Sequence, residues 1–189
     1  MSHDTTHINR RMSRFDSHDS VWLFGYGSLI FKADFPYLER RPASIQGWSR
    51  RFCQGSHDHR GTEQAPGRVQ TQVPDHGATC HGTAYLVTPE EFAHLDHREK
   101  NGYLRLATDI AFADGSVAEG IVYIATAENA AYLGPASERD IARQIATARG
   151  PSGPNSEYLL EMARALRELG MHDEHVEALA RHLQDFIQS

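Results

Sequence analysis

The sequence predicts an α+β fold, in which a curved or barrel-like β-sheet is followed by helices that pack on it. From Val21 to about Ala125, short apolar or alternating runs are separated by turn residues, a pattern typical of strands. After Ala125 the apolar residues recur at helical spacing. Strands first and helices afterwards indicate an α+β arrangement. The length of 189 residues and the apolar content of 40% fit one domain with a single core.

The strand region contains six runs with strand character, at residues 21–26, 43–54, 67–73, 80–87, 103–113 and 116–125. The last two flank Asp114-Gly115, a dipeptide that favours the positive φ angles of a tight hairpin turn. Between the fourth and fifth runs, Thr88 predicts an N-cap, with Pro89 at the first helical position and Glu91 three residues on. Asn101-Gly102 is predicted to end this short helix.

Three further helices are predicted beyond the strands. The first begins at the capping box of Ser137 and Asp140 and stops at Gly150-Pro151. The second begins at Asn155 or Ser156 and ends before Gly170, and the third begins at about Asp173. Their inward faces are predicted to carry Ile141 and Ile145, then Tyr158, Met162, Leu166 and Leu169, then Val176, Leu179, Leu183 and Phe186.

Residues 1–19 are polar and nearly free of large apolar side chains, so we expect a disordered, mobile tail ahead of a domain at residues 20–189. The formal charge of −6 argues against a general nucleic-acid binder. Cys53 and Cys80 form neither a disulfide framework nor a CxxC metal spacing, which favours a reducing cytoplasm. No stretch approaches a membrane span or a secretory signal, so a soluble protein is expected.

The sequence GYGSL at residues 25–29 places glycines at the end of a strand, where backbone N–H groups can converge on an anion. A plain strand bulge or turn explains the same residues equally well. The stretch is not a P-loop, because GxxxxGK[ST] is absent, and it is not a nucleophile elbow, because Ile30 stands where a second glycine is needed. Ser28 is therefore not expected to be a covalent nucleophile.

Twelve histidines raise the question of a metal site. His57 with His59, and His94 with His97 one helical turn apart, have ligand-compatible spacings, but neither pair has a convincing third ligand. Solvated or loop-bonded histidines are the favoured interpretation.

The basic residues of WSRRFCQGSHDHRGTEQAPGRV could converge on a small carboxylate-bearing ligand, although an exposed strand with alternating charges fits them better by composition alone. Adjacent Arg50 and Arg51 should point to opposite faces of a strand, so at most one of them faces the core side. The remaining basic candidates are Arg60 and Arg68. Glu99, at the end of the short helix, is by position alone an ordinary surface glutamate.

Taken together, FGYGSLIF, RRFCQGSHDHRGT, APGRV, LDHREKNGY, GPSGPNSEYL and ALRELG resemble the ChaC family of glutathione-specific γ-glutamylcyclotransferases, in order from Trp22 to Leu169. The resemblance implies the γ-glutamylcyclotransferase fold, a small mixed barrel with helices. It also implies cofactor-independent, metal-free cleavage of glutathione to 5-oxoproline and cysteinylglycine, a lyase reaction of glutathione catabolism.

The resemblance assigns the catalytic base and acid to Glu99 and a pocket wall to Tyr158. It assigns the substrate loop to Gly25, Tyr26, Gly27, Ser28, Leu29 and Ile30. Of the arginines, we assign Arg51 to substrate binding. Two positions depart from the family pattern, since Cys53 stands where tryptophan is usual and Asn101 replaces the first glycine of GGY.

Three alternatives stay open at this point. The protein could act on other γ-glutamyl amides, could be a non-catalytic γ-glutamyl-binding regulator, or could be a histidine-dependent metalloenzyme. In the favoured interpretation its partner is a small-molecule substrate, with no nucleic acid and no membrane involved, and no oligomeric state is predicted.

Overall fold

The computed structural model describes residues 4–188. The chain divides into two compact units. The first contains the residues up to Ser49 together with Gln72–Ala130, and the second contains Arg50–Thr71 together with the residues from Ala131 onward. Each unit has its own set of buried side chains.

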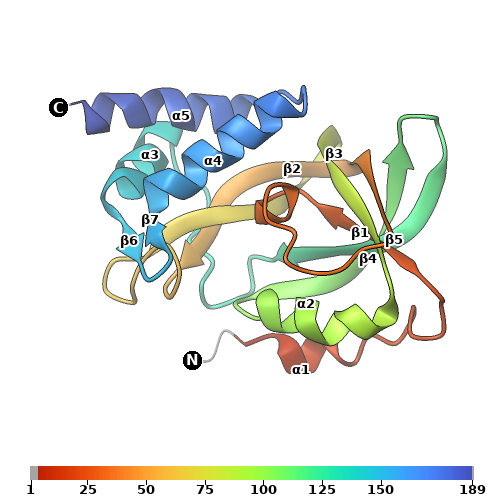
Figure 1. Cartoon of the computed structure of the whole chain (residues 1–189). Helices are drawn as coiled ribbons and strands as arrows, with labels where there is room; N and C mark the ends of the chain where they lie inside the picture. Colours follow the sequence, from red (N-terminus) through yellow and green to blue (C-terminus); the bar gives the residue numbers. More distant parts are fainter. Residues whose placement is uncertain (1–3, 189) are drawn as a thin grey trace. The chain divides into compact units, whose positions relative to one another are not determined.

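Five strands form a closed barrel in the order β1-β3-β2-β4-β5 (Figure 1). They are β1 (Val21–Gly25), β2 (Glu39–Ser56), β3 (Gly67–Val87), β4 (Tyr103–Phe112) and β5 (Val117–Ala125). β1 pairs with β5 in parallel and with β3 antiparallel, so the barrel is mixed. The predicted α+β class, with a barrel and packed helices, is confirmed.

β3 is one continuous strand where the sequence predicts two, at 67–73 and 80–87. The intervening residues 74–77 are exposed and polar, which favoured a turn. In the structure they extend beside β2, and polar side chains link the two strands, with the Thr79 hydroxyl donating to Gln46 Oε1 at 2.9 Å. Strand pairing here therefore overrides the weak local preference.

The predicted hairpin at Asp114-Gly115 is confirmed. Gly115 has φ +87°, and Ala111 lies opposite Val117 on the paired strands. Asp114 Oδ1 accepts a hydrogen bond from the Ser116 amide at 2.8 Å, which closes the turn. This hairpin lies at the far end of β4 from Tyr103, where the candidate site begins.

Two buried clusters lie on opposite sides of β1. Phe24 belongs to one cluster, with Ile45, Ile110 and Val122, and Leu23 belongs to the other, with Leu95 of the short helix. Successive residues of a strand point to opposite faces, so a strand buried on both faces reads as a continuous apolar run. The run VWLF therefore fixes β1 between the barrel interior and a helix.

That helix, α2 (Phe92–Arg98), follows the short 3-10 turn η2 (Pro89–Glu91). Thr88 is the N-cap of η2 and Pro89 is its first residue, as predicted, although the Thr88 side chain makes no capping hydrogen bond. α2 ends with Glu99 as its C-cap residue. The predicted end of the helix at Asn101-Gly102 is therefore correct to within three residues.

The N-terminal segment differs from the mobile tail that its composition predicts. α1 (Thr6–Asn9) contacts α2 and β4 (Figure 1). Phe15 is only 3% exposed and belongs to the buried cluster that contains Leu23 and Leu95. The segment buries one aromatic ring and two polar side chains, Thr5 and Asn9, that bond to the backbone of β4. The number of apolar residues in a segment does not reflect such hydrogen bonds, so composition alone predicts no order here. Residues 1–3 of the predicted tail lie outside the described residues.

The second unit contains α3 (Glu138–Thr147), α4 (Asn155–Glu168) and α5 (Glu174–Ile187), which pack on one another, and the short pair β6 (Arg149–Gly150) and β7 (Gly153–Pro154). The Ser137 hydroxyl accepts from the Asp140 amide at 3.1 Å, so the first predicted cap is confirmed. Asp173 Oδ1 accepts from the Val176 amide at 3.0 Å and caps α5.

The predicted inward faces are confirmed except at two residues. Leu169 follows the last residue of α4 and is 44% exposed, because the helical face ends before it. Phe186 is half-buried and lies under two guanidinium groups. The Cζ atoms of Arg139 and Arg143 lie 5.1 and 5.5 Å from the centroid of its ring. It therefore packs against cations of α3 and not in the core.

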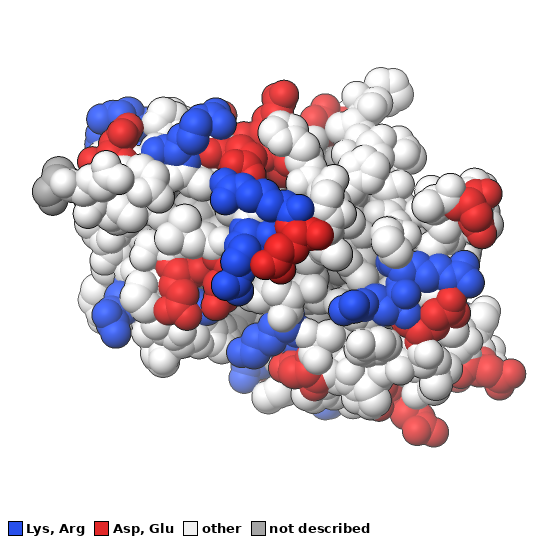
Figure 2. Space-filling model, turned by 45° about the horizontal axis from the view of Figure 1, so that its top comes forward, with Lys and Arg blue, Asp and Glu red and all other residues white. Residues whose placement is uncertain are grey.

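Charged side chains of both signs alternate over the face shown in Figure 2. Among the described residues, several oppositely charged side chains form surface pairs, including Arg14 with Glu119 at 2.6 Å and Arg167 with Glu177 at 2.7 Å. Such exposed pairs contribute little to stability. In the residues that the structure describes, no helix is both long enough and apolar enough to cross a membrane.

We expect His175 at the start of α5 to make stability pH-dependent. Burial and the nearby Arg51 lower its pKa from 6.5 to about 4, and its Nε2 accepts from the Phe52 amide at 3.2 Å, which needs the neutral ring. The unfolded chain therefore binds the proton more readily, so stability present above pH 6.5 is lost as the pH falls towards 4. The loss is about 3 kcal/mol. Calorimetric Tm values from pH 4 to 7 should fall less steeply in His175→Gln than in the wild type.

Candidate functional site

The loop that follows β1 depends on Gly25. A Cβ atom on Gly25 would lie 2.8 Å from Leu29 Cβ, which is closer than Cβ atoms approach, and 3.3 Å from the Thr83 carbonyl oxygen, which is a tight contact. Gly27 then caps the 3-10 turn η1 (Ser28–Ile30), and no side chain occupies the cap. The first amides of such a turn have no acceptors within the turn. The GYGSL stretch is thus a tight turn with available N–H groups.

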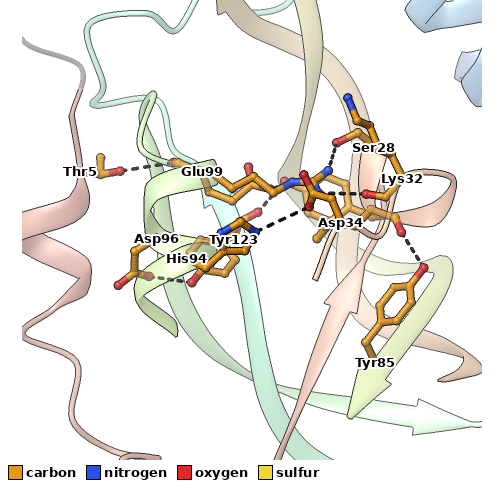
Figure 3. Close-up of polar contacts among 12 residues, drawn as sticks. Thr5, Ser28, Lys32, Asp34, Tyr85, His94, Asp96, Glu99 and Tyr123 are labelled. Atoms are coloured by element: carbon orange, nitrogen blue, oxygen red, sulfur yellow. Dashed lines mark hydrogen bonds and ion pairs between the residues drawn. The ribbon is translucent and has the colours of Figure 1, made fainter. Parts of the chain in front are cut away.

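Two tyrosine hydroxyls hold this loop. Tyr26 Oη donates to the Tyr123 carbonyl at 2.6 Å. Tyr85 Oη donates to the Leu29 carbonyl at 2.6 Å, and Figure 3 shows this tyrosine. Tyr26 and Tyr85 are both buried, and so are Leu29 and Ile30. Tyr26 and Tyr85 therefore hold the loop in position, and no sequence pattern singled out Tyr85.

Glu99 lies at the start of a turn formed by residues 99–103, which we call the Glu99 turn. Its amide donates to the Leu95 carbonyl at 2.9 Å, so its backbone continues from α2. Gly102 has φ +98°, and no non-glycine residue in the described part of the chain has positive φ. The left-handed position of the turn is therefore Gly102, and Asn101 introduces no strain there.

Arg98 connects Glu99 with residues 25–30, which we call the glycine loop. Figure 3 shows Glu99 together with the partners Ser28, Lys32 and Asp34. Arg98 Nη2 donates to Ser28 Oγ at 3.1 Å, its Nη1 donates to the Lys32 carbonyl at 2.9 Å and pairs with Asp34, and its Nε lies 3.4 Å from Glu99 Oε1. The predicted catalytic glutamate and the predicted substrate loop are thus joined through one guanidinium. The clue in the sequence was the direct adjacency of Arg98 and Glu99, while nothing there indicated Asp34.

Burial raises the pKa of Glu99, and the Asp34 carboxylate adds to the rise, while Arg98 opposes it. The Glu99 side chain is 15% exposed, so the carboxylate has lost most of its hydration. Desolvation prevails although Arg98 points towards Glu99. A carboxylate with a raised pKa accepts and returns a proton more readily near neutral pH than an exposed glutamate does.

A buried hydrogen-bonded pair lies beside Glu99. Tyr123 Oη donates to Asp96 Oδ1 at 2.6 Å, and burial together with Asp96 raises the pKa of Tyr123, to which the Glu99 charge also contributes. Tyr123 therefore stays protonated and keeps Asp96 bonded. Neither residue was singled out by the sequence patterns.

Arg51 and Tyr158 belong to the second unit. Arg51 Nη1 donates to the Arg50 carbonyl at 2.7 Å and is half-exposed, whereas Arg50 is buried and pairs with Asp173 at 2.7 Å. The two adjacent arginines thus have different surroundings, as alternation predicts. The Tyr158 hydroxyl accepts from Gln70 Nε2 at 3.1 Å. Roles of Arg51 and Tyr158 in substrate binding remain predictions.

Cys53 is buried in the second unit, and burial raises the pKa of its thiol, which makes it a poor nucleophile. The described residues contain no group of three or more His, Cys, Asp or Glu side chains arranged to hold a metal ion. His59 Nδ1 lies 3.2 Å from Ser152 Oγ, and His94 Nε2 lies 4.0 Å from Asp34 Oδ1.

We expect two substitutions to shift the Glu99 pKa in opposite directions. Arg98→Met keeps the aliphatic stem but removes the cation, so the Glu99 pKa should rise further. Asp34→Asn removes a like charge, so the Glu99 pKa should fall. Carbon-detected NMR titration of the Glu99 carboxyl group measures both. Shifts in the same direction would contradict this account of the site.

Comparison with known proteins places the chain. A family model described as ChaC-like protein matches residues 21–186. Gamma-glutamylcyclotransferase 2-3 of Arabidopsis thaliana is 45% identical over 89% of this chain and 90% of its own length, and glutathione-specific gamma-glutamylcyclotransferase 1 of Homo sapiens is 40% identical over 85% and 77%. A crystal structure of a glutathione-specific γ-glutamyl cyclotransferase from yeast has a TM-score of 0.83 at 30% identity and covers 89% of this chain and 97% of its own. The chain therefore belongs to the ChaC-like protein family.

Proposed function

We propose that this protein is a γ-glutamylcyclotransferase that cleaves glutathione to 5-oxoproline and cysteinylglycine. The observation that carries the proposal is the largely buried Glu99, which has a raised pKa. The guanidinium of Arg98 connects it to the glycine loop, whose first amides are available to a ligand. The names of the relatives support the same activity and the same substrate.

The substrate carries its own nucleophile in this reaction. The α-amine of a γ-glutamyl group can reach the γ-carbonyl carbon, form a C–N bond and close a five-membered lactam. The bond from that carbon to the cysteine nitrogen then breaks. The enzyme supplies a folded, near-attack geometry, which can be worth several kcal/mol of barrier.

The glycine loop is suited to the developing negative charge. Backbone N–H groups at the start of η1 can hold the γ-carbonyl oxygen as it becomes an oxyanion, or the α-carboxylate. The buried anchors Leu29 and Ile30 and the two tyrosine hydroxyls keep these amides in place before the substrate arrives. The side chain of Ser28 accepts from Arg98, a cation that cannot act as its general base.

Glu99 moves the protons. The bound ammonium must lose one proton to become nucleophilic, and the attacking nitrogen must lose a second as the lactam forms. Glu99 carries these two protons one at a time: as carboxylate it accepts each, and as carboxylic acid it gives each to the cysteine nitrogen, which leaves as an ammonium group while Glu99 returns to its carboxylate form. A single carboxyl group thus acts as base and then as acid.

The proposal also covers the partner and the compartment. Roles of Arg51 and Tyr158 in substrate binding stay predictions, and the partner is a small molecule and not nucleic acid. The two cysteines are buried and are not in a disulfide, which agrees with a cytoplasmic setting. A preference for other γ-glutamyl amides, with Cys53 in place of the usual tryptophan, is the second candidate. Turnover of glutathione, γ-glutamyl amino acids and γ-glutamylamines compared side by side decides between the two.

Glu99→Gln should abolish turnover while it preserves binding. Loss of the proton acceptor is expected to lower kcat by about 10²–10⁴-fold. The measurement is 5-oxoproline and cysteinylglycine released from glutathione, with binding followed by calorimetry. In the wild type, kcat should fall as the pH decreases through the raised Glu99 pKa, above the ordinary value of 4.5. Full activity of the variant would refute the assignment.

The same variant should be more stable than the wild type at neutral pH. Because the folded state holds the Glu99 proton more tightly than the unfolded state, ionisation of Glu99 destabilises the fold as the pH rises through 4.5 and beyond. Glutamine avoids that cost. The Tm difference between Glu99→Gln and wild type should be positive at pH 7 and shrink below pH 4.5. A lower Tm for the variant at pH 7 would contradict the raised pKa.

Ser28→Ala should retain activity within about tenfold, because only one hydrogen bond to Arg98 is lost. The check is steady-state kinetics with mass spectrometry of the protein during turnover. A trapped acyl group on Ser28 in the wild type would overturn the proposed mechanism.

A further inference from the structure

Residues 4–12 bond to the Glu99 turn, although they lie outside the family match, which begins at residue 21. The Thr5 amide donates to the Lys100 carbonyl at 2.8 Å. The Thr5 hydroxyl lies 2.7 Å from the Tyr103 carbonyl oxygen and 3.0 Å from that of Lys100, and Figure 3 shows Thr5 directed at the backbone of Glu99. Thr5 is 7% exposed, so little water competes for these carbonyls. We call residues 4–12 the N-terminal brace.

Asn9 acts as a substitute for a neighbouring strand. Its Nδ2 donates to the Tyr103 carbonyl at 3.0 Å, and its Oδ1 accepts from the Arg105 amide at 2.8 Å. These are two backbone groups that point to the same side of β4, where a paired strand would otherwise meet them. β4 pairs with β2 at Ala111 and Phe112, far from this end.

Arg105 connects the brace to the body of the first unit. Its Nη2 donates to the carbonyls of Asn9 at 2.6 Å and Met12 at 3.1 Å, as a cation does at the end of a helix. Its guanidinium lies 4.3 Å from the Phe92 ring centroid on α2, and its Nε lies 3.8 Å from Asp96 Oδ1. The brace is thereby bound at both ends, at Thr5 to the Glu99 turn and at Asn9 and Met12 to Arg105 of β4.

From these contacts we propose that Thr5 and Asn9 are positioning residues that hold the Glu99 turn closed around the carboxylate. The inference rests on the proposed function. Carbonyl groups just past the end of a helix have no partners within it, so without the brace they would recruit water. Water at the Glu99 turn would loosen the carboxylate and rehydrate it. The brace thus keeps Glu99 both placed and desolvated.

Thr5→Val tests this, because valine keeps the shape and removes the hydroxyl. We expect kcat to fall about tenfold with KM within about twofold, since a small displacement of a catalytic group is costly. The acidic limb of kcat should move to lower pH as Glu99 is rehydrated, while the other groups that face Glu99, namely Arg98, Asp34 and Tyr123, stay in place. Thr5→Ser should restore both. Hydrogen exchange at the Glu99 and Gly102 amides should quicken in Thr5→Val.

Two controls separate positioning from general loss of stability. His7→Ala changes an exposed residue of the same helix and should leave kinetics and exchange unchanged. Gly115→Ala strains the hairpin at the far end of β4, where φ is +87°, so it should lower Tm without moving the pH profile. Thr5→Val with wild-type kcat and pH profile, or with changes that match those of Gly115→Ala, overturns the proposal. If the wild type releases no 5-oxoproline, the proposed function fails, and exchange at the Glu99 turn alone then decides whether the brace holds it.

Discussion

The arrangement of the first unit depends on a carboxylate and a guanidinium that leave α2 as consecutive residues. Arg98 donates to Ser28 and to the Lys32 carbonyl and pairs with Asp34, and its Nε lies 3.4 Å from Glu99 Oε1. A full bidentate pair would have held Glu99 ionised and its pKa low. Because Arg98 is shared, burial prevails and the Glu99 pKa is raised.

The contacts of Arg98 also connect the two parts of the candidate site, the glycine loop and the Glu99 turn. The loop that follows β1 and the turn that follows α2 are about seventy positions apart in the chain, and Arg98 bonds to one while it adjoins the other. The tyrosine hydroxyls and the packing around Gly25 fix the loop from the barrel side. Different contacts therefore position the loop and the turn, and the side chain of Arg98 joins them.

Much of this structure could be predicted from local patterns. The hairpin at Asp114-Gly115, the caps at Ser137 and Asp173 and the buried helix faces follow from turn geometry and periodicity. The single long β3 could not, because its exposed middle is held by the neighbouring strand. The ordered segment before β1 was missed for a related reason, since its order comes from side-chain bonds to β4. Glu99 itself looked like a surface residue, and only the resemblance singled it out. Its burial depends on contacts distant in sequence.

The two tyrosine tethers have a consequence for how members of such a family can diverge. The loop motif is contiguous and easy to recognise. The position of its amides, however, depends on the hydroxyl of Tyr85 on β3 and on the carbonyl of Tyr123 on β5. Changes on those strands could tilt the loop by fractions of an ångström while every letter of GYGSLI stays the same. Two chains with identical motifs could therefore differ in the ligands they accept, and the residues responsible would lie on the strands of the barrel.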